Sequence, residues 1–368
     1  MNDNKYCVKH IGFIPPPYGG VSVYIKRLVE QLTIDGFPSG AYYLDSDIDA
    51  FYIESALFHK WHWLNTRFFF KRFQSLKNEV KSFRIIHSHL SLESAIFLWG
   101  LNVFCNKEIV VTVHNSMVDN YYQKTNFINK IFLFLLAKRN IFWIAVSQQA
   151  KLEMEKLPIC FKNKIQIIPA YIPSNITNKT SLPKSLEQFI EDSEKIITFY
   201  GHSFMKNCGN DIYGFFDAIE MYSSLVKQYK TCARLVYCIA DMNDEKELSK
   251  IRLLASELNI SDKIYWQIGP LENMHALWNH TDVYIRPTST DGDSVAIREA
   301  LDLGLNVVAS DVCMRPDGVL VYNYNHNIDF VTKVNDALKL ERKGINMNYT
   351  YYDNILDIYK SILKKGDL

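Results

Sequence analysis

The sequence predicts an α/β protein with two doubly wound, Rossmann-like domains that face a central cleft. Three observations support this prediction. Short β-branched or aromatic runs alternate with amphipathic helical periodicity along almost the whole chain, which is typical of parallel sheets built from βαβ units. A length of 368 residues suits two domains of ordinary size. A segment rich in Pro, Ser, Thr and Asn, residues 170–194, interrupts the alternation between two similar halves.

The candidate strands fall into two sets. Those of the first half are residues 7–14, 40–44, 84–88, 109–114, 142–146 and 165–168. Those of the second half are residues 196–200, 235–240, 264–268, 283–286, 307–310 and 319–322. Helical segments fill most gaps, and the first of them places Ile25, Leu28, Val29 and Leu32 on one face. Ligands of such sheets bind beyond the carboxyl ends of the strands, so the residues directly after each strand are the candidates for a site.

The Pro-, Ser- and Asn-rich segment sets the expected domain organisation. We predict an N-terminal domain over residues 1–172 and a C-terminal domain over residues 190–345. Residues 346–368 are predicted as a final helix that packs back on the N-terminal domain.

Composition excludes several classes of protein. Lys and Arg number 41 against 40 Asp and Glu, a net charge of +1, so a nucleic-acid-coating protein is not expected. The cysteines are scattered, without CxxC pairs or zinc-ligand spacing, which favours free thiols in a reducing compartment. The N-terminus lacks the pattern of a secretory signal. The longest apolar run, residues 131–137, is far shorter than the ~20 residues of a membrane span. A cytoplasmic location is expected.

Candidate binding residues follow strands in the first half. Gly19 and Gly20 lie between the first strand and its helix, where glycine lets the backbone approach a ligand and free helical N–H groups favour an anion. A tight turn is the structural alternative. His114 follows a complete apolar strand and is expected to face the cleft, where a neutral imidazole can donate to a sugar hydroxyl or phosphate oxygen. His87 and His89 are expected to pack, with only His89 exposed.

The strongest local feature runs from a strand end into a helix over residues 287–304. Asp293 or the serine after it is expected to cap that helix. Glu299 lies about one and a half turns further, where its carboxylate can accept hydrogen bonds from ribose hydroxyls. An N-capped covering helix with a solvated Glu299 is the structural alternative. The expected anion-binding N–H groups are those at the helix start, namely Ser294, Val295 and Ala296.

These features occur together, and in this order, in one known family. The sequence resembles retaining nucleotide-sugar glycosyltransferases of the GT-B fold, family 4 (glycosyl transferases group 1), over nearly the whole chain. The motifs that carry the resemblance are the Gly-Gly turn in PPYGGVSVYIKRL, the strand ends HSH and TVHN, AVS at 145–147, IIP at 167–169, and the acidic-x7-Glu segment at 291–299.

The resemblance implies a role for each matching position. The two glycines approach the donor phosphates or the acceptor, and His114 contacts the donor sugar. Asp291 lies beside the transferred sugar, and Glu299 binds the ribose. No cofactor and no metal are implied, because helix N–H groups and cations meet the diphosphate in place of a divalent ion. Asp291-Gly-Asp293 imitates a metal-binding motif, but we interpret Asp293 as a capping residue.

The sequence departs from the family at two places. Asp291 is shorter by one methylene than the usual Glu. The Gly-Arg pair expected after the first strand of the second domain is Gly201-His202 here, and Lys206 precedes its glycine by three positions rather than one. A diphosphate leaving group still requires compensating positive charge. The candidates are Lys206, Arg298 and Arg315, of which we favour the first two, so that the predicted catalytic residues are His114, Asp291, Lys206 and Arg298.

Residues 58–83 combine six lysines and arginines, a single acid, and interleaved Trp and Phe. This composition predicts contact with an anionic membrane surface, where the rings enter the interface and the cations meet lipid phosphates. RNA binding is the less favoured alternative, and a helix pair with a solvated basic side is the structural one.

The resemblance and the basic aromatic segment together predict a function. The chain is expected to move a sugar, with retention, from a nucleoside diphosphate sugar to a glycan or a polyprenyl-diphosphate-linked oligosaccharide, in bacterial surface polysaccharide (O-antigen, lipopolysaccharide or capsule) synthesis. The expected location is the inner face of the cell membrane. Two alternatives stay open: a GT-B nucleotide-sugar epimerase, and a non-catalytic homologue that binds a sugar nucleotide or glycan.

Overall fold

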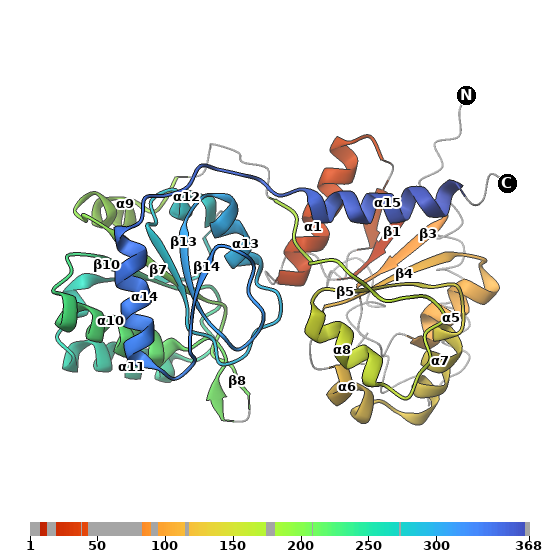
Figure 1. Cartoon of the computed structure of the whole chain (residues 1–368), viewed down its shortest axis with the longest axis horizontal. Coiled ribbons are helices and arrows are strands. Elements are labelled where there is room, and N and C mark those ends of the chain that lie inside the picture. Colours follow the sequence, from red (N-terminus) through yellow and green to blue (C-terminus); the bar gives the residue numbers. More distant parts are fainter. Residues whose placement is uncertain are drawn as a thin grey trace. The chain divides into compact units, whose positions relative to one another are not determined.

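The computed structural model describes residues 8–12, 20–37, 39–42, 83–89, 95–114, 118–173, 181–207, 209–271 and 274–364. The chain divides into two compact units, one formed by Met1–Ile172 with Tyr349–Leu368 and the other by Pro173–Asn348. Each unit contains one parallel six-stranded sheet with helices on both faces (Figure 1). The predicted α/β class is confirmed, and every predicted strand is present with ends that shift by a few residues.

The sheet of the first unit has the strand order β2-β1-β3-β4-β5-β6. Strand β2 pairs with one edge of β1, and the next strand in the sequence, β3, pairs with the other edge of β1. The order therefore reverses between β1 and β3, which is the position where ligands bind in doubly wound sheets. The strands are β1 (Val8–Ile11), β2 (Ser39–Tyr42), β3 (Ile85–Ser88), β4 (Glu108–Val113), β5 (Phe142–Ala145) and β6 (Gln166–Ile167).

Two separate cores cover the two faces of this sheet. Successive residues of a strand point to opposite faces, so Ile109 and Val111 enter one core and Val110 enters the other. Strands buried on both faces read as continuous apolar runs, as the sequence showed. One core is covered by α5 (Ala95–Phe104), α6 (Val118–Lys124), α7 (Phe127–Ala137) and α8 (Gln148–Lys156), and the other by α1 (Gly20–Ile34) and α15 (Thr350–Lys364).

The C-terminal helix α15 returns to the first unit and lies beside α1 (Figure 1). Its buried side chains share a core with Ile25 and Leu28 of α1. The hydroxyl of Tyr352 donates to the Asp35 carboxylate at 2.6 Å, just beyond the end of α1. Tyr359 reaches the sheet itself, where its hydroxyl meets His87 Nδ1 at 2.5 Å.

The sheet of the second unit has the order β11-β10-β7-β12-β13-β14. Its reversal point lies between β7 and β12, which pair in parallel with Ile285 opposite Phe199. The strands are β7 (Ile196–Gly201), β10 (Arg234–Ile239), β11 (Ile264–Ile268), β12 (Val283–Arg286), β13 (Asn306–Ser310) and β14 (Val319–Tyr322).

Helices again cover both faces of this second sheet. Val308 enters the core on one face, while Val307 enters the core on the other. The first core is covered by α10 (Phe215–Tyr229), α11 (Glu245–Glu257), with the short η3 (Ser261–Lys263) after it, and α14 (Asn327–Lys339). The opposite face is covered by α9 (Lys184–Glu191), α12 (Met274–Trp278) and α13 (Val295–Asp302).

Two elements were not predicted. Helix α9 falls inside the predicted linker, because Leu182 and Leu186 find an apolar partner in Val236 of the sheet. A small antiparallel hairpin follows β7, formed by β8 (Lys206–Asn207) and β9 (Asn210–Asp211). Strands of this length are too short to produce a periodic pattern.

Some sequence predictions fall outside the described residues. Gly19 and almost all of the basic aromatic segment, residues 58–82, are among them. Within the part of the chain that the structure describes, no helix is both long enough and apolar enough to cross a membrane.

Candidate functional site

The reversal point of the second sheet gathers most of the predicted site residues. His202 follows β7, and the segment from Pro287 to Asp293 follows the adjacent strand β12. A backbone bond from Ser289 N to Ile212 O, 3.0 Å, joins the second segment to the chain just after β9. Two loops far apart in the sequence therefore meet at the carboxyl edge of the sheet, where ligands of such folds bind.

A glycine permits this close approach. Gly214 has a φ of +71°, and a Cβ atom built there would lie 2.1 Å from the Pro287 carbonyl oxygen. Gly214 is also the N-cap residue of α10. Only glycine satisfies both the backbone conformation and the contact.

Helix α13 begins at this edge. Ser294 is its N-cap, and the Ser294 Oγ accepts from Ile297 N at 3.4 Å, so the serine and not Asp293 performs the predicted capping. The N–H groups at the start of a helix have no intrahelical acceptor and carry the positive end of the helix dipole. Val295 and Ala296 thus occupy positions that favour an anion.

Asp293 instead pairs with Arg298 one turn into the same helix. Arg298 Nε donates to both carboxylate oxygens of Asp293, at 2.7 and 3.0 Å. Both side chains are largely buried. Burial raises the pKa of Asp293 while the Arg298 charge opposes that rise. Arg298, one of the two favoured cations, is therefore already engaged by a carboxylate.

Asp291 is held between two arginines. Arg286 donates through Nε at 2.9 Å and through Nη2 at 3.2 Å, and Arg315 Nη1 donates at 2.8 Å. Burial alone would raise the pKa of Asp291, but the charges and hydrogen bonds of Arg286 and Arg315 outweigh it and lower the pKa to about 2. Asp291 is consequently ionised at neutral pH and serves as the anchor of two buried cations.

Each of the two arginines has further partners. Arg315 Nε donates to the Ser310 carbonyl at 2.8 Å, and its Nη2 lies 3.2 Å from Thr288 Oγ1. Arg286 Nη1 lies 3.4 Å from the Tyr284 hydroxyl, and its guanidinium is 5.4 Å from the centre of the Tyr213 ring. Sequence reasoning missed Arg286. The available signal was a charged residue at the last position of an otherwise apolar strand.

His202 and Lys206, the departures from the family pattern, occupy different environments. His202 is half-buried, and its carbonyl accepts from Asp241 N at 2.7 Å. Lys206 is exposed on β8. Among the described residues, no hydrogen bond or ion pair joins Lys206 to Asp291. The described cations that are buried at this edge are Arg286, Arg298 and Arg315.

Glu299 lies inside the unit rather than on a solvated helix face. Glu299 is only 6% exposed, and Trp278 Nε1 donates a hydrogen bond to Glu299 Oε2 at 3.5 Å. The structural alternative of a solvated glutamate is therefore wrong.

The reversal point of the first sheet gathers histidines. His10 lies on β1 opposite His87 on β3, and His89 and His114 follow β3 and β4. His89 lies 3.1 Å from His10 and 3.1 Å from His114, measured between ring nitrogens. His87 Nε2 lies 2.7 Å from Thr112 Oγ1.

Burial controls the protonation of these rings. It lowers the pKa of His10 and of His114 to about 3, and lowers the pKa of His87 and His89 well below the usual range. All four imidazoles are neutral at physiological pH. The expectation that His89 is exposed is wrong, since it is only 6% exposed, whereas His114 is partly exposed.

Three of the histidines, His10, His87 and His89, bring ligand nitrogens within 4.8 Å of one another. Such a cluster could in principle hold a metal ion. However, both ring nitrogens of His87 and of His89 already have hydrogen-bond partners. Only His10 Nε2 lacks one within the described residues. A metal would have to displace bonds that already satisfy the cluster.

Gly20 is the first residue of α1 and is exposed. Its position at a helix start agrees with the predicted turn, while its neighbour Gly19 lies outside the described residues.

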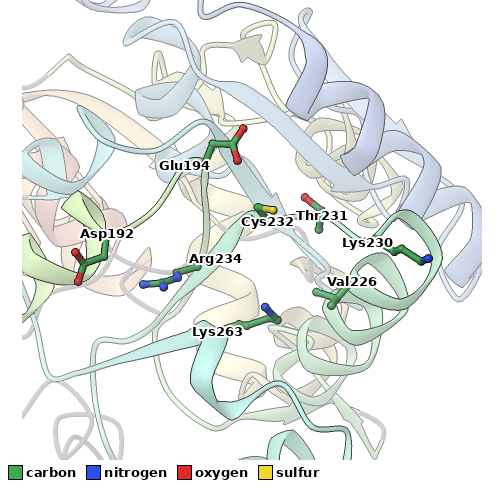
Figure 2. A pocket seen from close by; sticks show the side chains of 8 residues that line it. All are labelled: Asp192, Glu194, Val226, Lys230, Thr231, Cys232, Arg234 and Lys263. Carbon is green, nitrogen blue, oxygen red and sulfur yellow. The ribbon is translucent and has the colours of Figure 1, made fainter.

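A cavity of about 600 Å³ lies in the second unit but away from this edge. Figure 2 shows its lining, in which Arg234 opens β10 and Asp192 and Glu194 precede β7. It therefore belongs to the amino edge of the sheet, opposite the strand ends described above. The lining contains both acids (Asp192, Glu194) and cations (Lys230, Arg234, Lys263), so its charges do not select one kind of ligand.

Comparison with known proteins agrees with this geometry. Residues 183–349, which contain the whole second sheet and α13, match the family model for glycosyl transferases group 1. A search of curated proteins finds none that matches the sequence.

Solved structures resemble the fold of the whole chain at low sequence identity. Sucrose-phosphate synthase from Thermosynechococcus elongatus has a TM-score of 0.65 at 14% identity, covering 98% of this chain and 100% of that one. The lipopolysaccharide outer core galactosyltransferase WaaB has 0.61 at 14%, covering 96% and 99%. HepE from Anabaena, in complex with UDP and glucose, has 0.61 at 10%, covering 97% and 100%.

Two Rossmann-like units, each built on one parallel six-stranded sheet, make up the GT-B fold, and this chain has that fold. The match to the family model for glycosyl transferases group 1 lies in its second unit.

Proposed function

We propose that the chain is a retaining glycosyltransferase that moves a sugar from a nucleoside diphosphate sugar to a glycan or lipid-linked oligosaccharide during bacterial surface polysaccharide synthesis. The observation that carries the proposal is the β7/β12 edge of the matched domain, where the start of α13 adjoins two buried arginines. That combination suits an anionic leaving group. The lipopolysaccharide acceptor class is suggested by the name of WaaB.

The donor diphosphate is proposed to bind this edge without a metal ion. Arg286 and Arg315 share the single carboxylate of Asp291, so the triad keeps one excess positive charge. The N–H groups of α13 add the positive end of a helix dipole. Together they replace the missing arginine of the family, where His202 stands. HepE, solved with UDP and glucose, supports a nucleotide sugar as the donor.

Transfer is proposed to follow a front-face path. The acceptor hydroxyl oxygen attacks the anomeric carbon, the bond from that carbon to the diphosphate oxygen breaks, and the hydroxyl proton passes to the departing diphosphate. Positive charge aimed at the leaving oxygens stabilises the transition state. Glu299 holds the ribose, and neutral His114 donates a hydrogen bond to a sugar or phosphate oxygen.

A peripheral location on the inner face of the cell membrane is proposed as well. Helix α7 supports it within the described residues, because its outward face is apolar. Phe127, at 76% exposed, Ile131, Phe134 and Leu135 share that face. Lys138 lies over the Phe134 ring at 4.3 Å. Exposed rings flanked by cations suit an anionic lipid surface. The composition of residues 58–83 is the second support for this location.

A non-catalytic sugar-nucleotide-binding homologue is the second candidate. His202 in place of arginine and the commitment of Asp291 to two ion pairs favour it. Such a protein would bind the nucleotide without releasing product.

Thermal stabilisation followed by turnover separates the candidates. UDP, GDP, ADP, CMP and their sugar conjugates are added in turn, since a ligand selective for the native state raises the melting temperature. Stabilisation by one diphosphate class, with release of that nucleoside diphosphate when acceptor is present, supports the transferase. Stabilisation without release with any acceptor supports the binder. No stabilisation by any of them contradicts a nucleotide-sugar site.

A further inference from the structure

Three histidines at the β1/β3 reversal point form a chain of ring-to-ring contacts. Nδ1 of His10 lies 3.1 Å from Nε2 of His89, and Nδ1 of His89 lies 3.1 Å from Nε2 of His114. Within the described residues the chain ends at Nε2 of His10 and at Nδ1 of His114. Both distances are those of ordinary hydrogen bonds.

Each of these two ring-to-ring contacts is a hydrogen bond if exactly one of its two nitrogens carries a proton. A neutral imidazole carries one N–H and one lone pair, and burial keeps all three rings neutral. If His89 carries its proton on Nδ1, then His114 must accept on Nε2 and His10 must donate from Nδ1. If His89 carries it on Nε2, both neighbours must reverse. The three rings therefore share one tautomer, and only two arrangements satisfy both links.

The two ends of the chain decide between these arrangements. His10 Nε2 is buried and has no hydrogen-bond partner within the described residues, whereas His114 is partly exposed. The all-Nε2–H arrangement would bury an N–H donor without an acceptor at His10. Orphaned N–H groups are rarer in native backbones than under-satisfied acceptors, and we apply the same preference here. The all-Nδ1–H arrangement places the remaining N–H on His114, the partly exposed residue.

We propose that His10 and His89 are positioning residues that hold His114 in its Nδ1–H tautomer, so that His114 presents a neutral donor to an oxygen of the nucleotide sugar. The identity of that oxygen rests on the function proposed above, but the tautomer does not. Phosphate oxygens accept hydrogen bonds. The Nε2–H tautomer of His114 would instead direct the lone pair of Nδ1 at a lone pair of the phosphate oxygen, which is repulsive. A fixed tautomer also removes the need to reorient the ring when the ligand binds.

His87 provides a matched control. It is as buried as its neighbours, and its ring centre lies 4.1 Å from that of His89. Its two nitrogens contact Tyr359 and Thr112, and not the chain. A change at His87 disturbs the same core while leaving both links in place.

The first test is the imidazole ¹⁵N spectrum of the full chain labelled with ¹⁵N-histidine, without substrate. A protonated and a bare ring nitrogen resonate far apart, and substitution of each histidine in turn assigns its signals. We expect His10, His89 and His114 all to carry the proton on Nδ1. A uniform Nε2–H pattern, a mixture of tautomers or a charged ring would overturn the proposal.

The second test uses His89→Phe, which keeps the ring and removes both nitrogens. We expect His114 to populate both tautomers, with a fall in kcat of about 10- to 100-fold, as when other partners that orient a functional histidine are removed. His87→Phe should leave the His114 signals unchanged. An unchanged His114 tautomer in His89→Phe would overturn the proposal. If that variant does not fold, the spectrum of the unaltered chain still decides. Neither spectrum depends on transferase activity, so the two proposals can fail separately.

Discussion

The carboxylate of Asp291 and the guanidinium of Arg315 are 24 residues apart in the chain and 2.8 Å apart in the fold. Arg315 lies in the loop after β13, and its pair with Asp291 ties that loop to the one after the neighbouring strand β12. Arg286 meets the same carboxylate from the end of β12 itself. The first acid of the family motif is thus an anchor for two cations.

This anchor predicts a specific dependence of stability on pH. The pKa of Asp291 is lowered to about 2 in the folded chain, below its ordinary value, so its ion pairs stabilise the fold at neutral pH and lose that contribution as the pH falls through the folded-state pKa. Denaturant unfolding from about pH 5 to about pH 2 should show the unaltered chain losing about 2 kcal/mol more than Asp291→Asn. Parallel pH profiles for the two proteins would contradict the ion-pair assignment.

Gly214 should be far more sensitive to substitution than a second glycine of the same unit. Gly214→Ala combines a positive φ with a backbone collision at Pro287, and should destabilise the chain by more than about 3 kcal/mol. Gly209 has a φ of +85° but no described atom within 4 Å of its added Cβ, so Gly209→Ala should cost only about 1–2 kcal/mol. Equal melting temperatures for the two variants would show that the contact with Pro287 is not needed.

His114→Ala should reduce transfer by about 100-fold or more, because it removes a donor aimed at the substrate. The fold should survive, since the substitution leaves one nitrogen of His89 unpaired at a cost of about 1–3 kcal/mol. The measurement is kcat at saturating donor, beside the melting temperature. Normal turnover would exclude His114 from the reaction.

Glu299→Ala should weaken nucleotide binding by about 10- to 100-fold, because a charged acceptor for the ribose hydroxyls is lost. Titration calorimetry with the stabilising nucleoside diphosphate measures the effect. Glu220, exposed on α10, is the control, and Glu220→Ala should bind as the unaltered chain does. Equal affinity in a folded Glu299→Ala variant would remove Glu299 from the donor site.

Replacement of Phe127 and Ile131 by serine should weaken binding to vesicles that contain an anionic phospholipid by about tenfold, since each exposed apolar side chain contributes on the order of 1 kcal/mol. Ile328 on α14 is a matched exposed residue of the other unit, at 68% exposed. Ile328→Ser should leave binding unchanged. Equal binding by all three proteins would eliminate α7 as the membrane face.

A parallel variant tests the basic aromatic segment in the same vesicle assay. Replacement of the cations between Lys60 and Lys81 by neutral residues should reduce vesicle association, because the electrostatic attraction to lipid phosphates is lost. Nucleotide affinity should not change, because the substitutions leave the proposed donor site intact. Unchanged association would limit the membrane contact to α7.

Periodicity was enough to predict the sheets. The runs at residues 109–111 and 307–309 are apolar at successive positions, because parallel strands are buried on both faces, and this pattern is visible in the sequence. The hairpin of β8 and β9 and the helix α9 could not be predicted in the same way. The hairpin is too short for a period, and α9 depends on Leu186 finding an apolar surface on a strand some 50 residues later in the chain.

The site was only partly accessible to the same reasoning. Strand ends and the Ser294 cap are local features, so the sequence located His114 and the start of α13. Arg286 was missed because a cation at the end of an apolar strand says nothing about its partner. His10 was missed because its role depends on His89, 79 residues away.

The sequence by itself determined the α/β class, the strands of the two six-stranded sheets, most of the covering helices and the chain positions at which a ligand site could form, since these depend on local periodicity and on short motifs. Only the tertiary structure decided that Asp291 is held by Arg286 and Arg315, and that His89 links His10 to His114. Hydrogen bonds and ion pairs act over about 3 Å. Which groups come that close is set by strand order and loop path, and these join residues that are remote along the chain.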